Sequence, residues 1–264
     1  MTMKKMQLGL IGLAAVLLFV PSIVRGATIK AGIDGSFVDV PTFILSAEDG
    51  GNIAIGTSYE DPQFVYDVAG VGKVVMQGEL KPDPFISFAV AVTDPGAAST
   101  FSFSYVLPLA PTVMNPSFVK DSLSGSVTNG VAPGGVTVTA LAPPAAIPTD
   151  GDGIDELQVF TLSDDGGVTY KNVGLDAGPT TPVPLGSSGS GLYGAYNQGP
   201  IATIAGGPWT HMRVDLNFGL SGGGDIFTLN GGKELFTLTG NIPEPSSLLL
   251  GVLAAALIGL LRKR

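Results

Sequence analysis

Few residues of this 264-residue chain could carry out nucleophilic catalysis. His211 is the only histidine, in a strand-like pattern that would place Trp209 and Arg213 on the same face. Gly219-Leu-Ser-Gly-Gly223 has the G-x-S-x-G spacing of a nucleophile elbow, in which a helix and later a histidine follow the serine. Neither follows Ser221, so the stretch predicts a glycine-rich turn. We therefore predict no catalytic residues and a protein that is not an enzyme.

Two further patterns lack the context that their chemistry requires. Gly189-Ser-Gly-Leu-Tyr-Gly194 matches G-x-G-x-x-G, but that motif binds pyrophosphate between a strand and a helix, and this copy lies in a Gly/Ser-rich stretch. Asp155 and Glu156 are adjacent, so in a strand their carboxylates would point to opposite faces. A glycosidase instead needs two carboxylates that converge across a cleft. Neither pattern predicts a site.

The acidic stretch Asp150-Gly-Asp-Gly-Ile-Asp-Glu156 allows two interpretations. Alternate carboxylates in a glycine-rich turn suit Ca²⁺, which takes ~6–8 oxygen ligands. The stretch resembles the calcium loops of integrin-like and dockerin-like repeats, but Pro148 replaces the first acid of the integrin-type spacing, and Ile154 replaces the fifth-position acid of an EF-hand. We favour an acidic turn and no cofactor. The alternative is a Ca²⁺ site with Asp150, Asp152 and Asp155 as ligands and Glu156 as a further candidate.

Apolar and polar residues alternate with a period of two in the segments that must position these side chains, which is typical of β-strands. Residues 100–107 alternate three aromatic residues on one face with Ser102 and Ser104 on the other. No helical period occurs between the two ends of the chain. The predicted strands are 37–46, 73–80, 85–92, 100–107, 135–141, 157–162, 168–173, 209–220, 225–229 and 234–238.

Turn dipeptides rich in Gly, Asp and Asn separate these strands. Short strands with such punctuation predict an all-β body, a β-sandwich or jelly roll over residues 27–242. Residues 177–208 are rich in Gly, Pro and Ser, and we favour a long surface loop there over a boundary between two sheet units. The turn signals are Asp49-Gly50, Asp94-Pro95-Gly96, Asn129-Gly130, Asp165-Gly166 and Asn230-Gly231.

Composition narrows the choice of partners. Between Ala27 and Ile242 there are seven basic and 21 acidic residues, a net charge of −14. A body that acidic repels phosphate backbones, so nucleic acid is not an expected partner. The chain has no cysteine, so an exported form would have to hold its fold without disulfides.

The N-terminus has the layout of a secretory signal peptide over residues 1–26. Lys4 and Lys5 provide a basic start, residues 8–20 are uncharged and mostly apolar, and Pro21 ends the apolar run. The apolar run is shorter than the ~20 residues that span a bilayer. We therefore expect a signal helix that signal peptidase removes near Ala27.

The C-terminus reads as a membrane-spanning tail. Residues 248–261 carry no charge and are apolar on every face. Arg262, Lys263 and Arg264 follow directly, and such a cluster stays on the cytoplasmic side while its side chains extend to the membrane surface. We therefore expect a C-terminal transmembrane helix.

Directly before this helix stands Pro243-Glu244-Pro245. The order of motif, apolar helix and basic end resembles the PEP-CTERM sorting signal of Gram-negative and related bacteria, over residues 243–264. Ile242 stands where Val is common. The resemblance implies recognition of Pro243, Glu244 and Pro245 by an exosortase, and localisation to the envelope or surface of biofilm-forming bacteria that secrete exopolysaccharide.

Together these features predict a non-enzymatic exported cell-surface or extracellular-matrix protein, anchored to the membrane transiently or permanently by its C-terminal helix. The alternative is a carbohydrate-binding module, with or without Ca²⁺, that contacts exopolysaccharide through exposed aromatic residues such as Trp209, Tyr193 and Tyr196. A third class, a secreted hydrolase, has no convergent set of catalytic residues to support it.

Overall fold

The computed structural model describes residues 27–45, 51–81, 84–130, 135–142, 156–173, 183–184, 189–202 and 206–237. These residues form strands, turns and connecting segments, with no helix among them. It follows that none of them belongs to a helix able to cross a membrane. All described strand pairs are antiparallel, and the prediction of an all-β body is confirmed.

The first of two sheets holds eight of the described strands, in the order β12-β11-β15-β8-β1-β2 with β10 and β13 beside them. The long strands β8 and β15 form its centre and pair over most of their length. The strands are β1 (Thr28–Ile33), β2 (Ser36–Asp39), β8 (Ser99–Val113), β10 (Thr137–Ala140), β11 (Gln158–Ser163), β12 (Lys171–Asn172), β13 (Val183–Pro184) and β15 (Trp209–Leu220).

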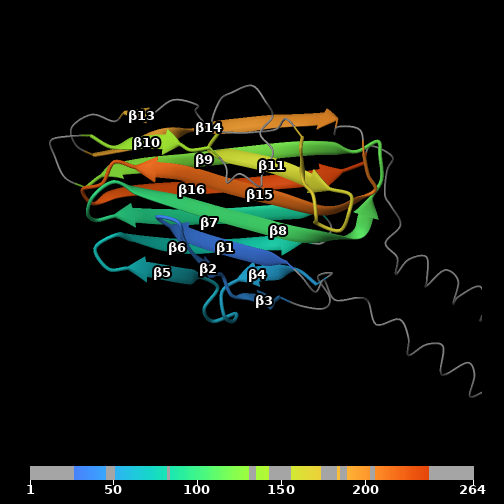
Figure 1. Cartoon of the computed structure of the whole chain (residues 1–264), viewed down its shortest axis with the longest axis horizontal. Coiled ribbons are helices and arrows are strands. Elements are labelled where there is room, and N and C mark those ends of the chain that lie inside the picture. Colours follow the sequence, from blue (N-terminus) through green and yellow to red (C-terminus); the bar gives the residue numbers. More distant parts are fainter. Residues whose placement is uncertain are drawn as a thin grey trace, which may run out of the picture.

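The second sheet also holds eight described strands, in the order β14-β9-β16-β7-β6-β4-β3 with β5 paired to β6. Strands of both sheets run along the long axis of the molecule (Figure 1). The strands are β3 (Thr42–Ile44), β4 (Ile53–Ile55), β5 (Phe64–Val68), β6 (Gly72–Lys81), β7 (Phe85–Asp94), β9 (Phe118–Asn129), β14 (Gly189–Ala202) and β16 (Asp225–Phe236).

The two sheets pack face to face around one apolar core, an arrangement consistent with a β-sandwich. The rings of Phe88 and Tyr105 stack across the interface at 5.3 Å, and those of Phe218 and Phe227 meet edge to face at 4.9 Å. On β8 the predicted alternation is confirmed, since its aromatic residues are buried while Ser102 and Ser104 are half-buried on the other face.

One predicted turn is wrong. Asn230-Gly231 was expected to separate two strands, but β16 runs unbroken through it and pairs with both β7 and β9. Gly231 faces the core opposite Phe88, where a Cβ atom would lie 2.4 Å from the Cζ atom of that ring. The glycine therefore provides space for an aromatic ring in the core, and it does not mark a reversal of the chain.

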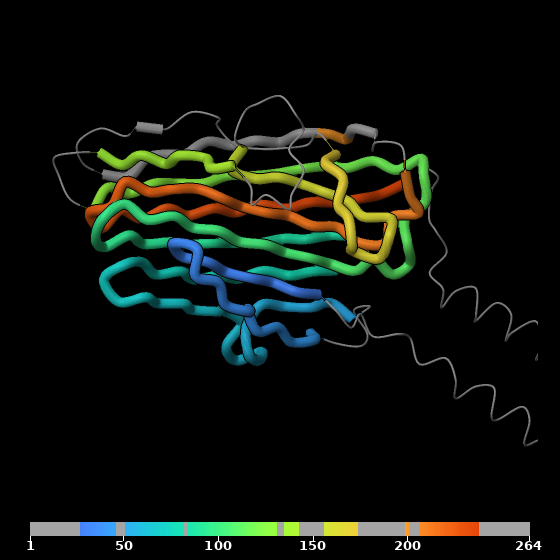
Figure 2. Tube along the Cα trace, in the orientation of Figure 1, coloured from blue at the N-terminus to red at the C-terminus, as the bar shows by residue number. Residues whose placement is uncertain are grey.

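The segment 177–208, for which we favoured a long loop, contains a strand. β14 covers Gly189–Ala202 and pairs with β9 in the second sheet, with two register shifts. The sequence did not predict this strand, because its residues are small or polar and large apolar residues do not alternate there. The prediction also missed β1 and β9. Figure 2 shows β2 to β5 at one edge of the sandwich and β10 and β11 at the opposite edge.

Strands β10 and β11 lie end to end along the same side of β15. Ala140 pairs with Phe218, and Gln158 pairs with Leu216. Between them, the Leu141 N–H donates to the Asn217 carbonyl at 3.1 Å, and the Asn217 N–H donates to the Leu157 carbonyl at 3.0 Å. The chain therefore leaves the sheet and returns to it at one residue of β15.

Several predicted features lie outside the described residues. They are the signal peptide over residues 1–26, the motif Pro243-Glu244-Pro245, the C-terminal helix with Arg262, Lys263 and Arg264, and the acidic stretch with Asp150, Asp152 and Asp155. All of these stay predictions from the sequence.

Candidate functional site

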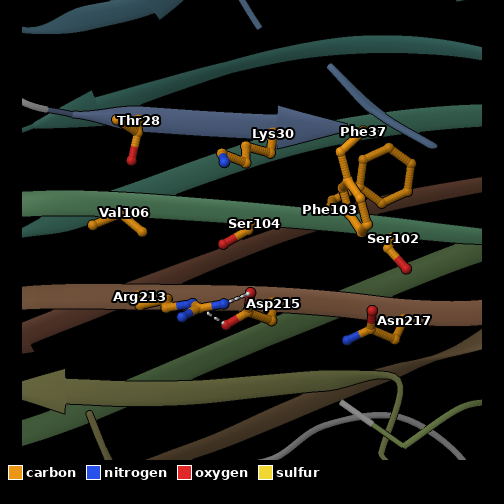
Figure 3. A pocket seen from close by; sticks show the side chains of 10 residues that line it. All are labelled: Thr28, Lys30, Phe37, Ser102, Phe103, Ser104, Val106, Arg213, Asp215 and Asn217. Atoms are coloured by element: carbon orange, nitrogen blue, oxygen red, sulfur yellow. Dashed lines mark hydrogen bonds and ion pairs between the residues drawn. The ribbon is translucent and has the colours of Figure 1, made fainter. Parts of the chain in front are cut away.

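Residues of β1, β2, β8 and β15 line a groove of about 370 Å³ on the outer face of the first sheet, and all of their side chains except that of the buried Phe103 point away from the core (Figure 3). The strand registers align them in rows, with Lys30 opposite Ser104 and Ser104 opposite Asp215. In the next row Ser102 lies opposite Asn217. The groove is lined by Thr28, Lys30, Phe37, Ser102, Phe103, Ser104, Val106, Arg213, Asp215 and Asn217.

A charged pair on β15 forms one wall of this outer-face groove. The Arg213 Nε atom lies 2.7 Å from Asp215 Oδ2, and its Nη2 atom donates to Asp215 Oδ1 at 3.0 Å. Burial raises the pKa of the Asp215 carboxyl, while Arg213 and a hydrogen bond with Ser104 oppose the rise. The Arg213 guanidinium also lies 5.3 Å from the centre of the Tyr170 ring. The Asp215 carboxylate and the Tyr170 ring thus hold the forked guanidinium of Arg213 in one orientation.

An aromatic ring forms the end of the groove. Phe37 on β2 pairs with Gly32 on β1, and a Cβ atom on Gly32 would lie 2.7 Å from the Phe37 ring. The ring therefore lies over the glycine on the sheet surface. It remains 50% exposed, which leaves much of it accessible to a ligand.

The groove suits binding better than acid–base catalysis. It offers a guanidinium, an ammonium, a carboxylate, an amide and three hydroxyls beside a half-exposed aromatic ring. Polar groups at fixed positions beside a flat apolar ring match a ligand that has both hydroxyls and an apolar face. Asp215 is the one carboxylate that lines the groove, so its described lining lacks the pair that glycoside hydrolysis needs.

The structure does not bring the candidate catalytic residues together. Ser221 follows the end of β15, where it donates to Asp225 Oδ2 at 2.7 Å and accepts from the Thr137 N–H at 2.9 Å. Gly222 and Gly223 beside it have φ angles of 89° and 85°, which fits the predicted glycine-rich turn. His211 lies near the other end of the strand, roughly 30 Å away at ~3.3 Å per residue.

The carbohydrate-contacting aromatics proposed from the sequence need one correction. Trp209 is fully buried, with its Nε1–H donating to Ser117 Oγ at 3.1 Å. The indole therefore belongs to the packed interior and cannot contact a ligand. The side chains of Tyr193 and Tyr196 lie outside the described part, although the backbone of residues 189–194 forms part of β14.

A rigid turn joins β11 to β12 near His211. The Asp165 carboxylate accepts from the Ser163 hydroxyl at 2.7 Å, from the Thr169 N–H at 2.9 Å and from the Val168 N–H at 3.1 Å. These bonds to Thr169 and Ser163 hold the pKa of Asp165 well below its usual range. Burial lowers the pKa of His211, and the nearby Asp165 charge opposes that shift.

The sequence alone did not predict the groove residues Lys30, Phe37, Asp215 and Asn217. One signal could have indicated part of the set, because Arg213, Asp215 and Asn217 alternate with apolar residues on one strand. Within the described ranges, no three His, Asp or Glu side chains lie close enough to hold a metal ion.

The fold and the groove define an all-β protein with a polar cleft on one sheet face. No protein-family model matches the chain, and no curated protein matches it. Among solved structures, it is similar to the enzymatically active domain of tailspike protein 4 from bacteriophage CBA120, with 14% identity and a TM-score of 0.30. That match covers 66% of this chain and 19% of the tailspike chain. A likeness this distant carries no argument about function.

Proposed function

We propose that this chain is a non-enzymatic, exported cell-surface or extracellular-matrix protein, delivered by an N-terminal signal helix and a C-terminal sorting signal. The observation that carries the proposal is Pro243-Glu244-Pro245 placed directly before an apolar run that ends in Arg262, Lys263 and Arg264. Signal peptidase and an exosortase are the processing partners. The C-terminal helix anchors the chain in the membrane before or instead of cleavage.

The mass of the mature protein from its native host tests this proposal. We expect an N-terminus near Ala27 and a C-terminus near Pro243. Glu244→Ala should abolish C-terminal processing, whereas the matched variant Ser247→Ala should leave it unchanged. Surface-extracted protein that still ends at Arg264 would contradict exosortase processing.

We further propose that the body binds exopolysaccharide through the outer-face groove. The observation that favours this function is the half-exposed Phe37 ring, which lies over Gly32 beside the Arg213–Asp215 fork. A sugar ring can stack on such an aromatic surface while its hydroxyls bond to the charged and amide groups. If Ca²⁺ assists binding, the candidate ligands remain Asp150, Asp152 and Asp155.

A glycan array tests the binding proposal. Wild-type protein should retain at least one polysaccharide, and Phe37→Ala should lose it. Tyr59→Ala is the matched control, because Tyr59 is a 64% exposed aromatic outside the groove lining. Equal binding by Phe37→Ala and wild-type protein would exclude the groove. Loss of binding in EDTA would add Ca²⁺ to the proposal.

A further inference from the structure

One lysine and one aspartate are buried in contact with each other between the two sheets. Asp121 on β9 and Lys233 on β16 lie directly opposite each other in the second sheet, and their side chains form an ion pair. Neither side chain has any exposed surface. A pair of charges removed completely from water carries a large desolvation penalty.

An amide and an aromatic ring from the facing sheet lie beside the pair. Gln158 reaches across from β11 in the facing sheet, and its Nε2–H donates to Asp121 Oδ1 at 2.8 Å. The Lys233 Nζ atom lies 5.4 Å from the centre of the Phe160 ring. Burial raises the pKa of the Asp121 carboxyl even with Lys233 beside it. Burial therefore opposes the ionised form of the Asp121 carboxyl.

We propose that Asp121 and Lys233 condense to form an intramolecular isopeptide bond that links β9 covalently to β16. The geometry supplies both reactants on facing positions of neighbouring strands, so that the reaction is unimolecular. The chain has no cysteine, so this amide would provide the covalent link that disulfides provide in other exported proteins.

The condensation needs no oxidant and no cofactor. One proton passes from the Lys233 ammonium to Asp121 Oδ2, which leaves a neutral amine beside a neutral acid. The nitrogen lone pair attacks Cγ and forms the C–N bond. The bond from Cγ to Oδ2 then breaks, and the departing hydroxyl takes a second proton from the nitrogen to leave as water. The Gln158 amide donates to Oδ1, the atom on which negative charge develops during the attack.

The other described ion pairs lack one of these requirements. Lys81 with Glu79 and Lys171 with Asp164 have lysine side chains that are 39% exposed, so neither pair is removed from water. Arg213 beside Asp215 carries a guanidinium and offers no primary amine. Among these pairs, Asp121–Lys233 alone combines a primary amine, complete burial and a donor to the carboxyl oxygen.

Peptide mass spectrometry of the folded full-length protein tests the inference. After digestion with trypsin and a second protease, we expect one branched peptide that joins the segments around Asp121 and Lys233. Its mass should equal that of the two segments less one water molecule. Trypsin should not cleave after Lys233, because the amide removes the charge that the protease recognises.

Two variants provide the controls. Lys233→Arg should abolish the branched peptide, whereas Lys81→Arg should leave it unchanged. The wild-type digest decides the question even if Lys233→Arg fails to fold. Two unlinked segments with complete cleavage after Lys233 would show that the pair remains ionic and would overturn the inference.

Discussion

Two pairs of opposite charges lie at different depths of this sandwich, and their surroundings give them different roles. Asp121 and Lys233 are fully buried between the sheets, where a primary amine lies against a carboxyl group. Arg213 and Asp215 lie on the outer face of the first sheet beside a groove, where the guanidinium presents a planar set of donors. The inner pair therefore fits a structural link, and the outer pair fits recognition of a ligand.

Removing one member of the inner pair should have the largest effect on stability. Lys233→Met removes the proposed amide link and leaves an unpartnered Asp121 carboxyl in the core, which we expect to reduce the free energy of unfolding by about 3–5 kcal/mol. Adding Asp121→Leu should recover part of this loss, since no buried charge then remains. Urea unfolding of the single and double variants measures both values. A double variant that is less stable than Lys233→Met would contradict this explanation.

Adjacent glycines on β16 compare the inner and outer faces directly. Gly231→Ala would place a methyl group 2.4 Å from the Phe88 ring, and we expect a loss of about 1–3 kcal/mol from overpacking. Gly232→Ala is the matched control, because its nearest neighbour would lie at 3.5 Å, an ordinary contact. Thermal unfolding should separate the two variants. Equal melting temperatures would show that the core yields at Gly231.

The outer face should respond in binding more than in stability. Phe37→Ala removes a half-exposed ring, so we expect roughly a tenfold loss of glycan affinity, or about 1.4 kcal/mol. The melting temperature should change little, because the ring is not part of the buried core. Calorimetric titration with the glycan found on the array measures the affinity. A large fall in melting temperature without a loss of affinity would assign Phe37 a structural role.

The smallest effect should come from Asp165, an exposed counterpart of the buried Asp121. Its pKa is lowered in the folded protein, so its stabilising effect is complete above the ordinary value of about 4 and disappears as the pH falls below it. Asp165→Asn should therefore melt at a lower temperature than the wild type at pH 7, and the difference should shrink under acid. Thermal scans at several pH values provide the test. A difference that stays constant with pH would exclude the carboxylate charge as its cause.

For β8 the sequence predicted which residues share a face, but it did not predict which strands are neighbours, and on β15 the predicted shared face of Trp209 and Arg213 is wrong because a register shift follows Trp209. Ser102 and Ser104 were placed correctly opposite the aromatic residues of β8. Their meeting with Lys30 and Asp215 depends on pairing between strands that are distant in the chain, which a local period does not encode. The groove was therefore not predicted, although most of its polar residues follow the expected alternation.

The local sequence pattern also did not predict which individual polar or aromatic side chains are buried. A lone tryptophan and a strand lysine are usually partly exposed, so neither Trp209 nor Lys233 was predicted to lie in the interior. Each is buried because it has a partner from a distant segment, Ser117 for the indole and Asp121 for the ammonium. Such partners become visible only once the sheets are assembled.

The junction of β10 and β11 has a consequence for how this protein can diversify. Because Leu141 and Leu157 both bond to Asn217, the base of the intervening segment is closed by the sheet itself. Replacement or lengthening of residues 143–155 should therefore leave these two hydrogen bonds and the register of β10 and β11 against β15 unchanged.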